Sequence, residues 1–276
     1  MVRTIDNFPV TIEDVRNANT IYGCDVTTLK GKTFYQQPKR VQEEYTEVPD
    51  SLKGKIGNLT VAADVMFVNG IPSMVSVSRG FNLKMVEYVT QRLKTVLANY
   101  TEKIFKFYKN KGYTIKTFLT DREFECIRDS LPGESNLNTT TKNDHVSEIE
   151  HRNCVIKERA ISLISTLMFK NTPGRIIIEL IWFVGIWINQ EPSENGVLDV
   201  YYPRNKIMVQ DLAYGNECKF RFWYYVEASE NHKITNDMEE QTVSGIRLGT
   251  NENFQGSYKI PPLKTSHVVP RKQKIR

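Results

Sequence analysis

Three acidic residues that are far apart in the chain lie in predicted elements that could bring them together to bind a pair of divalent cations. Asp64 lies inside the apolar run 61–68, Asp121 directly follows a second apolar run, and Glu150 lies in a long helical pattern. Mg²⁺ prefers carboxylate oxygens and keeps several waters, so a protein need supply only a few such side chains from rigid elements. Two ions about 4 Å apart support phosphoryl transfer on a nucleic-acid backbone, because they activate the nucleophile and neutralise charge. The sequence therefore predicts Asp64, Asp121 and Glu150 as catalytic residues and metal ligands.

Asp64 has the most unusual setting of the three. An acidic side chain within a strand runs against β-propensity, and burying its charge is costly without a cation. The alternative is an ordinary aspartate that faces water from a half-exposed strand.

The residues after Glu150 give the predicted helix a polar face. Asn153 and Lys157 follow Glu150 by three and seven positions, so the three side chains project from one side of a helix. Asn153 can fix a ligand carboxylate or a sugar, and Lys157 can reach a DNA phosphate. Arg152 and Arg159 point to other faces of the helix. We predict all four as DNA-binding residues; the alternative is an ordinary solvated helix face.

Two neighbours of Glu150 are polar but are assigned no role. Glu148 lies two positions earlier, turned by roughly 200° around the helix, so it and Glu150 cannot both face one metal site. His151 points roughly 100° away from Glu150.

Apolar periodicity predicts the elements that hold these side chains. An Asn-Gly step at Asn69 and Gly70 joins two β-rich runs and is typical of a hairpin. A further strand stops just before Asp121, at the strand end where open α/β sheets place their ligands. Asp144 or Ser147 can cap the helix that carries Glu150. The predicted strands are 59–68, 73–78 and 113–119, with a polar strand or loop at 136–142, and the predicted helices are 11–18, 85–110, 123–131, 146–170 and 175–190.

This order of elements is typical of a layered α/β domain. After residue 203 the pattern changes to short runs, 220–226, 244–248 and 257–260, which indicate a small β-rich module. We predict three parts: an N-terminal extension (1–55), a catalytic core (56–200), and a β-rich module with a basic tail (201–276).

Composition narrows the class of protein. The net charge of +5 is compatible with a polyanionic partner without requiring one. The cysteines Cys24, Cys126, Cys154 and Cys218 lie far apart, which argues against a disulfide scaffold or a zinc knuckle and favours a reducing compartment. The N-terminus has no signal-peptide pattern, and the longest apolar run is too short to cross a bilayer. The expected location is intracellular, in the nucleus or a cytoplasmic particle, and no association with a membrane is expected.

Three segments resemble the blocks of retroviral and retrotransposon integrase cores, whose pattern is Asp, Asp, Glu, followed by Asn and Lys at this spacing. The segments are 59–64 (LTVAAD), 118–125 (FLTDREFE) and 150–157 (EHRNCVIK). The resemblance implies a ribonuclease-H-like mixed sheet flanked by helices. It also implies two Mg²⁺ or Mn²⁺ ions, processing of element DNA ends, strand transfer into target DNA, and a homo-oligomer.

The flanking segments 21–32 (IYGCDVTTLKGK) and 245–258 (GIRLGTNENFQGSY) are similar to sequences that bracket the core in copia-type elements. The resemblance therefore identifies the chain with the integrase part of a copia-type LTR retrotransposon polyprotein.

The sequence departs from the family pattern at three points. Arg122 occupies a position that is usually small or amide-bearing, the interval from Asp121 to Glu150 is short, and no histidine and cysteine zinc module precedes the core. These departures indicate a polyprotein fragment or a decayed copy. Two alternatives to an active integrase follow: a catalytically inactive, nucleic-acid-binding remnant, and a related nuclease that only hydrolyses.

Overall fold

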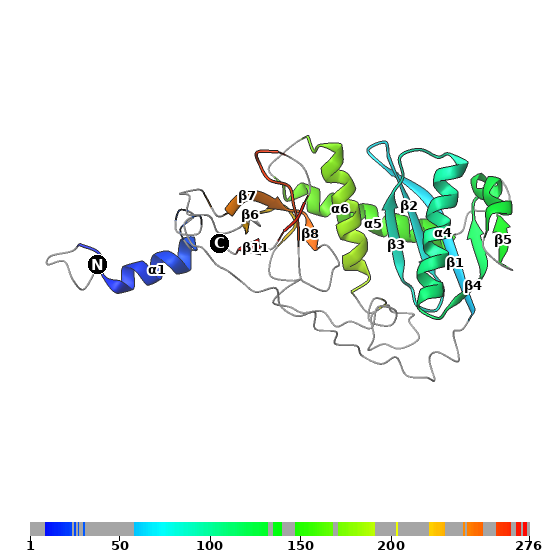
Figure 1. Ribbon diagram of the computed structural model, residues 1–276, viewed down its shortest axis with the longest axis horizontal. Helices are drawn as coiled ribbons and strands as arrows, with labels where there is room; N and C mark the ends of the chain where they lie inside the picture. Colours follow the sequence, from blue (N-terminus) through cyan, green and yellow to red (C-terminus); the bar gives the residue numbers. More distant parts are fainter. Residues whose placement is uncertain are drawn as a thin grey trace. The chain divides into compact units, whose positions relative to one another are not determined.

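The protein is described from a computed structural model, whose elements are shown in Figure 1. The residues described are 9–23, 25, 27, 30, 58–131, 135–139, 147–167, 171–190, 203, 221–229, 240, 242–250, 258–265, 269–271 and 273–274. The chain forms two compact units, residues 44–213 and residues 1–43 with 214–276. The predicted domain boundaries at 55/56 and 200/201 lie outside the described residues and stay predictions.

A five-stranded mixed sheet forms the centre of the larger unit. Its strands are β1 (Asn58–Val68), β2 (Ile71–Ser78), β3 (Lys84–Tyr88), β4 (Thr114–Thr120) and β5 (Asn136–Thr139). Their order is β3-β2-β1-β4-β5; the pairs among β1, β2 and β3 are antiparallel, whereas β4 pairs parallel to both β1 and β5. The predicted fold class, an α/β domain with a mixed sheet flanked by helices, is confirmed.

The hairpin between β1 and β2 forms where the Asn-Gly step predicted it. Val68 pairs with Ile71, so the loop contains two residues, and both have positive φ: 50° at Asn69 and 77° at Gly70. Two-residue loops with positive φ at both positions match the twist of the flanking strands, and Asn and Gly tolerate that conformation best.

Helices cover both faces of the sheet. They are α4 (Lys94–Asn110), α5 (Ser147–Ser165) and α6 (Gly174–Ile188), with the 3₁₀ helix η1 (Arg122–Ser130) after β4. Alternate residues of β1, including Val61 and Ala63, belong to one buried cluster with Leu97 and Ile104 of α4. On the other face, α5 packs against β1 and β2, and α6 packs against β2 and β3 (Figure 1).

The predicted helix 85–110 is wrong in its first part. Residues Lys84–Tyr88 form β3, and α4 begins only at Lys94. Val86 and Val89 fit the helical period of the residues that follow, which is why the sequence indicated one long helix. Tertiary pairing overrides this period, since β2 offers a free edge and the β-branched and aromatic residues of β3 suit a strand.

The remaining predicted elements of the larger unit form with shifted ends. The helix predicted at 123–131 is a 3₁₀ helix, and the polar segment after residue 135 is strand β5. The helices predicted at 146–170 and 175–190 are α5 and α6. Asp144, one of the two predicted caps of α5, lies outside the described residues.

Two residues of α6 hold it against β3. A Cβ atom on Gly185 would lie 2.8 Å from Cγ2 of Val86, so glycine permits the close approach. Asn189, at the end of α6, is buried, and its amide makes two hydrogen bonds with the backbone of Lys84. The Lys84 N–H donates to Asn189 Oδ1 at 2.8 Å, and Asn189 Nδ2 donates to the Lys84 carbonyl at 2.6 Å. The side chain thus extends the pairing of β3 as a neighbouring strand would.

Replacing Asn189 by Ala should lower the free energy of unfolding by about 2–4 kcal/mol, because two buried backbone groups of Lys84 lose their partners. Urea denaturation measures the loss. Asn99→Ala, at an exposed position of α4, is the matched control and should change stability by less than about 0.5 kcal/mol. Equal stability of the two variants would show that the Asn189 amide does not hold α6 to the sheet.

The described part of the smaller unit includes the helix α1 and two small sheets. Helix α1 (Ile12–Tyr22) begins with the predicted capping box between Thr11 and Asp14. One sheet has the order β11-β6-β7 and the other β10-β9-β8. The strands are β6 (Tyr224–Ser229), β7 (Thr242–Arg247), β8 (Gly249–Thr250), β9 (Tyr258–Ile260), β10 (Val269–Arg271) and β11 (Gln273–Lys274). The predicted β-rich C-terminal module is therefore present.

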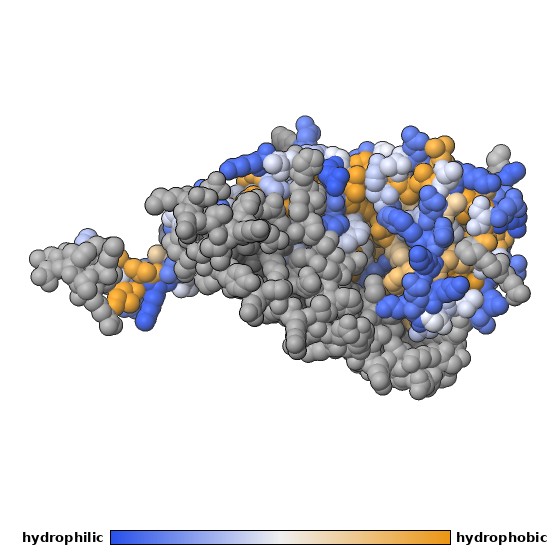
Figure 2. All heavy atoms as spheres, in the orientation of Figure 1, coloured by the Kyte–Doolittle hydropathy of each residue, from blue (hydrophilic) through white to orange (hydrophobic). Residues whose placement is uncertain are grey.

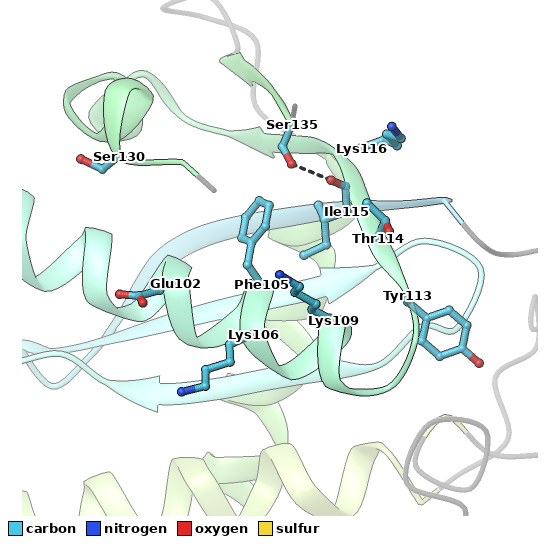
Figure 3. A pocket seen from close by; sticks show the side chains of 10 residues that line it. All are labelled: Glu102, Phe105, Lys106, Lys109, Tyr113, Thr114, Ile115, Lys116, Ser130 and Ser135. Carbon is cyan, nitrogen blue, oxygen red and sulfur yellow. Dashed lines mark hydrogen bonds between the residues drawn. The ribbon is translucent and has the colours of Figure 1, made fainter. Parts of the chain in front are cut away.

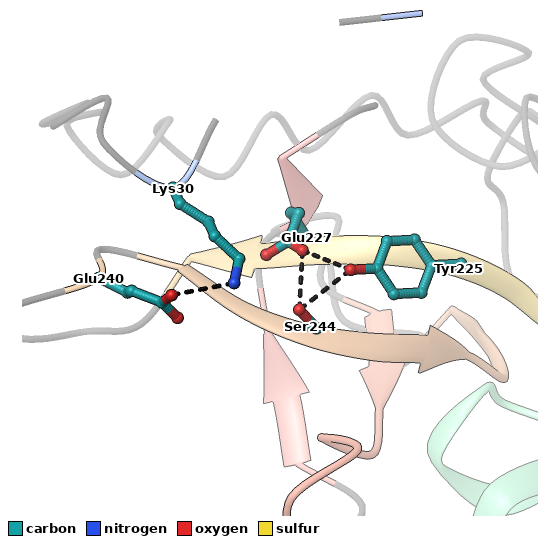
Figure 4. Close-up of polar contacts among 5 residues, drawn as sticks. All are labelled: Lys30, Tyr225, Glu227, Glu240 and Ser244. Carbon is teal, nitrogen blue, oxygen red and sulfur yellow. Dashed lines mark hydrogen bonds and ion pairs between the residues drawn. The ribbon is translucent and has the colours of Figure 1, made fainter. Parts of the chain in front are cut away.

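Strand β6 contains a buried acid, opposite Ser244 of β7. Glu227 is fully buried, and its Oε1 accepts hydrogen bonds from Tyr225 Oη at 2.7 Å and Ser244 Oγ at 2.8 Å. Nearby, Lys30 pairs with Glu240 at 2.9 Å, as Figure 4 shows. The pair joins a residue of the N-terminal segment to Glu240, two residues before β7, within this unit.

No helix among the described residues is both long enough and apolar enough to cross a membrane.

Candidate active site

Of the two aspartates of the predicted triad, Asp64 lies in β1 and Asp121 directly follows β4, the parallel neighbour of β1. The last pair of the two strands is Ala63 with Thr120, so Asp64 and Asp121 are the next residues of their segments in the same register. Asp121 keeps an extended backbone, with φ −71° and ψ 163°, before η1 begins. Neighbouring strands lie about 4.8 Å apart, and residues in register project from the same face. The pairing therefore brings both carboxylates to one face at the C-terminal end of β4.

That face is covered by α5, which reaches Asp64 directly. Asn153 of α5 is buried, and its Nδ2 donates a hydrogen bond to Asp64 Oδ2 at 2.8 Å. The other oxygen, Oδ1, accepts a hydrogen bond from the Val65 N–H at 2.7 Å. Both oxygens of the Asp64 carboxylate are thus held, and Asp64 is half-buried rather than turned to water.

The burial pattern of α5 explains how Glu150 comes to this edge. Ile149, Asn153, Ile156 and Ala160 are buried at spacings of four, three and four residues, which form one helical stripe against the sheet. Glu150 is exposed, one position beyond the first buried residue of that stripe. It therefore lies at the border between the buried face and solvent, close enough to act on Asp64 through its charge.

The electrostatics of Asp64 reflect this crowding of carboxylates. Burial raises the pKa of Asp64 above its ordinary value of 3.8, and the charges of Asp121 and Glu150 raise it further. The hydrogen bonds from Val65 and Asn153 act in the opposite direction, because they favour the ionised form. The net direction is upward. Three negative charges therefore repel one another at one end of the sheet, and a cation among them would relieve that repulsion.

These residues fit divalent ions in the chemistry of their donors. Hard carboxylate oxygens suit Mg²⁺ and Mn²⁺. Oδ1 of Asn153 is buried without a hydrogen-bond partner among the described residues, so it offers one further oxygen beside Asp64. Within the described part of the chain, no three His, Cys, Asp or Glu side chains lie close enough together to hold a metal ion by themselves. Mg²⁺ does not need three protein ligands, because it is usually held by one or two carboxylates with waters and substrate phosphates.

The raised pKa makes a prediction about stability without divalent ions. An ionised Asp64 costs the folded state free energy, and this cost appears as pH rises above 3.8 and through the folded-state pKa. Asp64→Asn is isosteric and removes the charge. In EDTA at pH 7 it should therefore raise Tm by about 2–4 °C, and the gain should shrink towards zero near pH 3. Thermal unfolding at both pH values measures this; a lower Tm for the variant at pH 7 would contradict it.

Glu148, the other carboxylate at the start of α5, points to a different partner. Its Oε2 accepts a hydrogen bond from Arg79 Nε at 2.8 Å, just beyond the end of β2. This ion pair accounts for Glu148 without any part in the carboxylate group around Asp64. The pair could not be predicted from the sequence, because Arg79 and Glu148 are 69 residues apart.

The other predicted DNA-binding residues spread around α5. Lys157 is half-buried, two turns after Glu150 on the same side of the helix. Arg152 Nη2 donates to Asn82 Oδ1 at 3.4 Å in the turn between β2 and β3. Arg159 lines a small cavity with residues of α5 and α6, including Trp187. The structure thus joins Asn153 to Asp64 by a hydrogen bond and places Asp121 and Glu150 near enough for their charges to act on Asp64. Arg152 and Arg159 point elsewhere.

Sequence reasoning missed one group that shapes the site, the Val65 N–H that holds Asp64 Oδ1. No sequence signal could have revealed it, since every residue but proline has this donor.

Comparisons with known proteins add one structural likeness. No family model and no curated protein matches the chain. Among solved structures, the catalytic core domain of BIV integrase is similar, with 11% identity and a TM-score of 0.38, over 54% of this chain and 93% of that chain.

Proposed function

We propose that this chain is a DNA integrase, a polynucleotidyl transferase that processes DNA ends and joins them to target DNA. One observation carries the proposal. Strand register brings Asp64 and Asp121 to one face, and α5 adds Glu150 and an Asn153 side chain that is hydrogen-bonded to Asp64. Three carboxylates and an amide on two strands and a helix suit metal-dependent phosphoryl transfer.

In this proposal Asp64, Asp121 and Glu150 hold two Mg²⁺ or Mn²⁺ ions. Bound ions would supply charge neutralisation on the attacking and leaving oxygens and would lower the pKa of a bound water or hydroxyl. Asn153 and the Val65 N–H fix both oxygens of the Asp64 carboxylate, so this ligand is oriented before substrate arrives. Lys157 is proposed to contact a DNA phosphate, and Arg152 and Arg159 are proposed as further DNA contacts.

The finer identity is also a proposal. The copia-like flanking segments support the integrase of an LTR retrotransposon polyprotein that acts as a homo-oligomer on element ends and target DNA. We propose an intracellular location, nuclear or within a cytoplasmic particle, because its substrate would be found there.

The test is a DNA-joining assay with the full chain. A labelled duplex pool with randomised ends is incubated with supercoiled plasmid and Mg²⁺ or Mn²⁺, and joined products are separated and sequenced. Integrase activity predicts metal-dependent joining that EDTA abolishes, with enrichment of particular end sequences among the joined products.

The two alternatives give different products. A nuclease that only hydrolyses would shorten the labelled strand and join nothing. An inactive remnant would bind DNA in a salt-sensitive manner, leave it intact, and bind equally well or better after Asp64→Asn. Either outcome would exclude integration as the function of this chain.

A further inference from the structure

A cavity lies in the larger unit at the end of β4 opposite to the carboxylates. It has a volume of about 690 Å³ and is lined by residues of α4, the start of β4, the end of η1 and Ser135. Thr114, Ile115 and Lys116 line it, whereas Asp121 follows the other end of the same strand. At about 3.3 Å per residue the two places are roughly 20 Å apart along the strand. The cavity is therefore separate from the candidate active site.

The centre of the cavity is lined by apolar residues that are largely buried. Phe105, Tyr113 and Ile115 line it and are nearly buried, with 9%, 6% and 3% of their surfaces exposed. Ser135 Oγ donates a hydrogen bond to the Ile115 carbonyl at 2.7 Å, which fixes one wall, as Figure 3 shows. Phe105 and Ile115 belong to the main core cluster, so this floor is part of the packed core.

Cations surround the apolar floor. Lys106, Lys109 and Lys116 are exposed, and none forms an ion pair with a residue that the structure describes. Lys103, on the same helix but outside the cavity, is paired with Glu87. The one acid on the lining, Glu102, leaves an excess of positive charge. The exposed side of α4 is accordingly hydrophilic in Figure 2.

The placement of the lysines selects the kind of anion. In Figure 3, Lys109 extends over Phe105 and Ile115, while Lys106 and Lys116 point outward on opposite sides. Lys116 also falls where the register between β1 and β4 shifts by one residue, an irregularity that re-aims a side chain. Cations separated in this way match several anions along an extended ligand better than a single phosphate.

The floor distinguishes a peptide from nucleic acid. Single-stranded nucleic acid binds by stacking bases on exposed aromatic faces, and Phe105 and Tyr113 are too deeply buried for that. Duplex DNA would meet the lysines but leave the apolar concavity empty. We propose that this cavity binds an acidic peptide segment of a partner protein, with an apolar side chain on Phe105 and Ile115 and carboxylates at the three lysines.

The test uses fluorescence anisotropy with the full chain and a labelled peptide, Gly-Asp-Glu-Asp-Leu-Phe-Glu-Asp-Glu-Gly. The double variant Lys106→Glu/Lys109→Glu should weaken binding by about tenfold or more, since two attractive charges become repulsive. The matched control, Arg16→Glu/Lys94→Glu, makes the same change in net charge at exposed positions outside the cavity and should bind almost as the wild type does. A peptide with Ser-Ser in place of Leu-Phe tests the apolar anchor without disturbing the core, and it should also bind at least about threefold more weakly.

Three results would overturn the proposal. They are the absence of saturable binding to the wild-type chain, equal losses in the two double variants, and a loss of duplex DNA binding in the cavity variant while peptide binding is kept. Asp64→Asn should bind the peptide as the wild type does, so failure of the proposed integrase function would leave this result unaffected.

Discussion

Asp64→Asn is expected to lower DNA end joining and end processing by about 10³-fold or more. The substitution keeps the shape of the side chain and removes the charge that would bind a divalent ion, whose contribution to phosphoryl transfer is several kcal/mol. Asp64 also interacts with each of the other residues of the site. It accepts hydrogen bonds from Val65 and Asn153, and the charges of Asp121 and Glu150 raise its pKa. Initial rates of joining at saturating Mg²⁺ measure the effect.

The expected stability of Asp64→Asn provides a control for misfolding. Because the neutral variant should be as stable as the wild type or more stable at pH 7, unfolding cannot explain a lost activity. DNA binding should be kept, since the substitution removes a negative charge. A variant that joins DNA at more than about a tenth of the wild-type rate would rule out Asp64 as a metal ligand in this reaction.

Glu150→Gln and Glu148→Gln form the second prediction, as a matched pair on one helix. Both substitutions remove one negative charge from the first turns of α5. Glu150 acts on Asp64 through its charge, whereas Glu148 is paired with Arg79. Glu150→Gln should therefore lower joining by about 10²-fold or more, while Glu148→Gln should stay within about threefold of the wild type.

The two variants are also expected to differ little from the wild type in stability. Glu148→Gln removes an exposed ion pair, which is worth at most about 1 kcal/mol. Equal losses of activity in the two variants would indicate a general effect of charge on α5 instead of a ligand at Glu150. Loss in Glu148→Gln alone would place the ligand of this helix at Glu148 instead of Glu150.

Much of the fold was predictable because local signals agree with the tertiary structure. The Asn-Gly hairpin after β1 and the end of β4 at Asp121 both follow from short-range chemistry. The prediction was wrong at β3, where residues with a helical period pair with β2 instead. Whether an edge segment forms a strand depends on the strand with which it pairs. The residues of β3 alone do not indicate that they will pair with β2.

The site divides in the same way. The residue types and spacing of Asp64, Asp121 and Glu150 were visible in the sequence, and so was the side of the helix that carries Asn153. The distance between Asn153 and Asp64, the pairing of Arg79 with Glu148, and the hold of Asn189 on β3 arise between residues 69 to 105 positions apart. These contacts depend on the tertiary structure and cannot be predicted from local sequence.

Anomalous diffraction from crystals of the full chain soaked in Mn²⁺ tests the central claim most directly. We expect anomalous peaks coordinated by Asp64 and Asp121, one of them also bound to Glu150, and their loss in Asp64→Asn crystals. Peaks located elsewhere, or well-ordered Asp64 and Asp121 carboxylates with no ion between them at saturating Mn²⁺, would contradict a metal-dependent transferase.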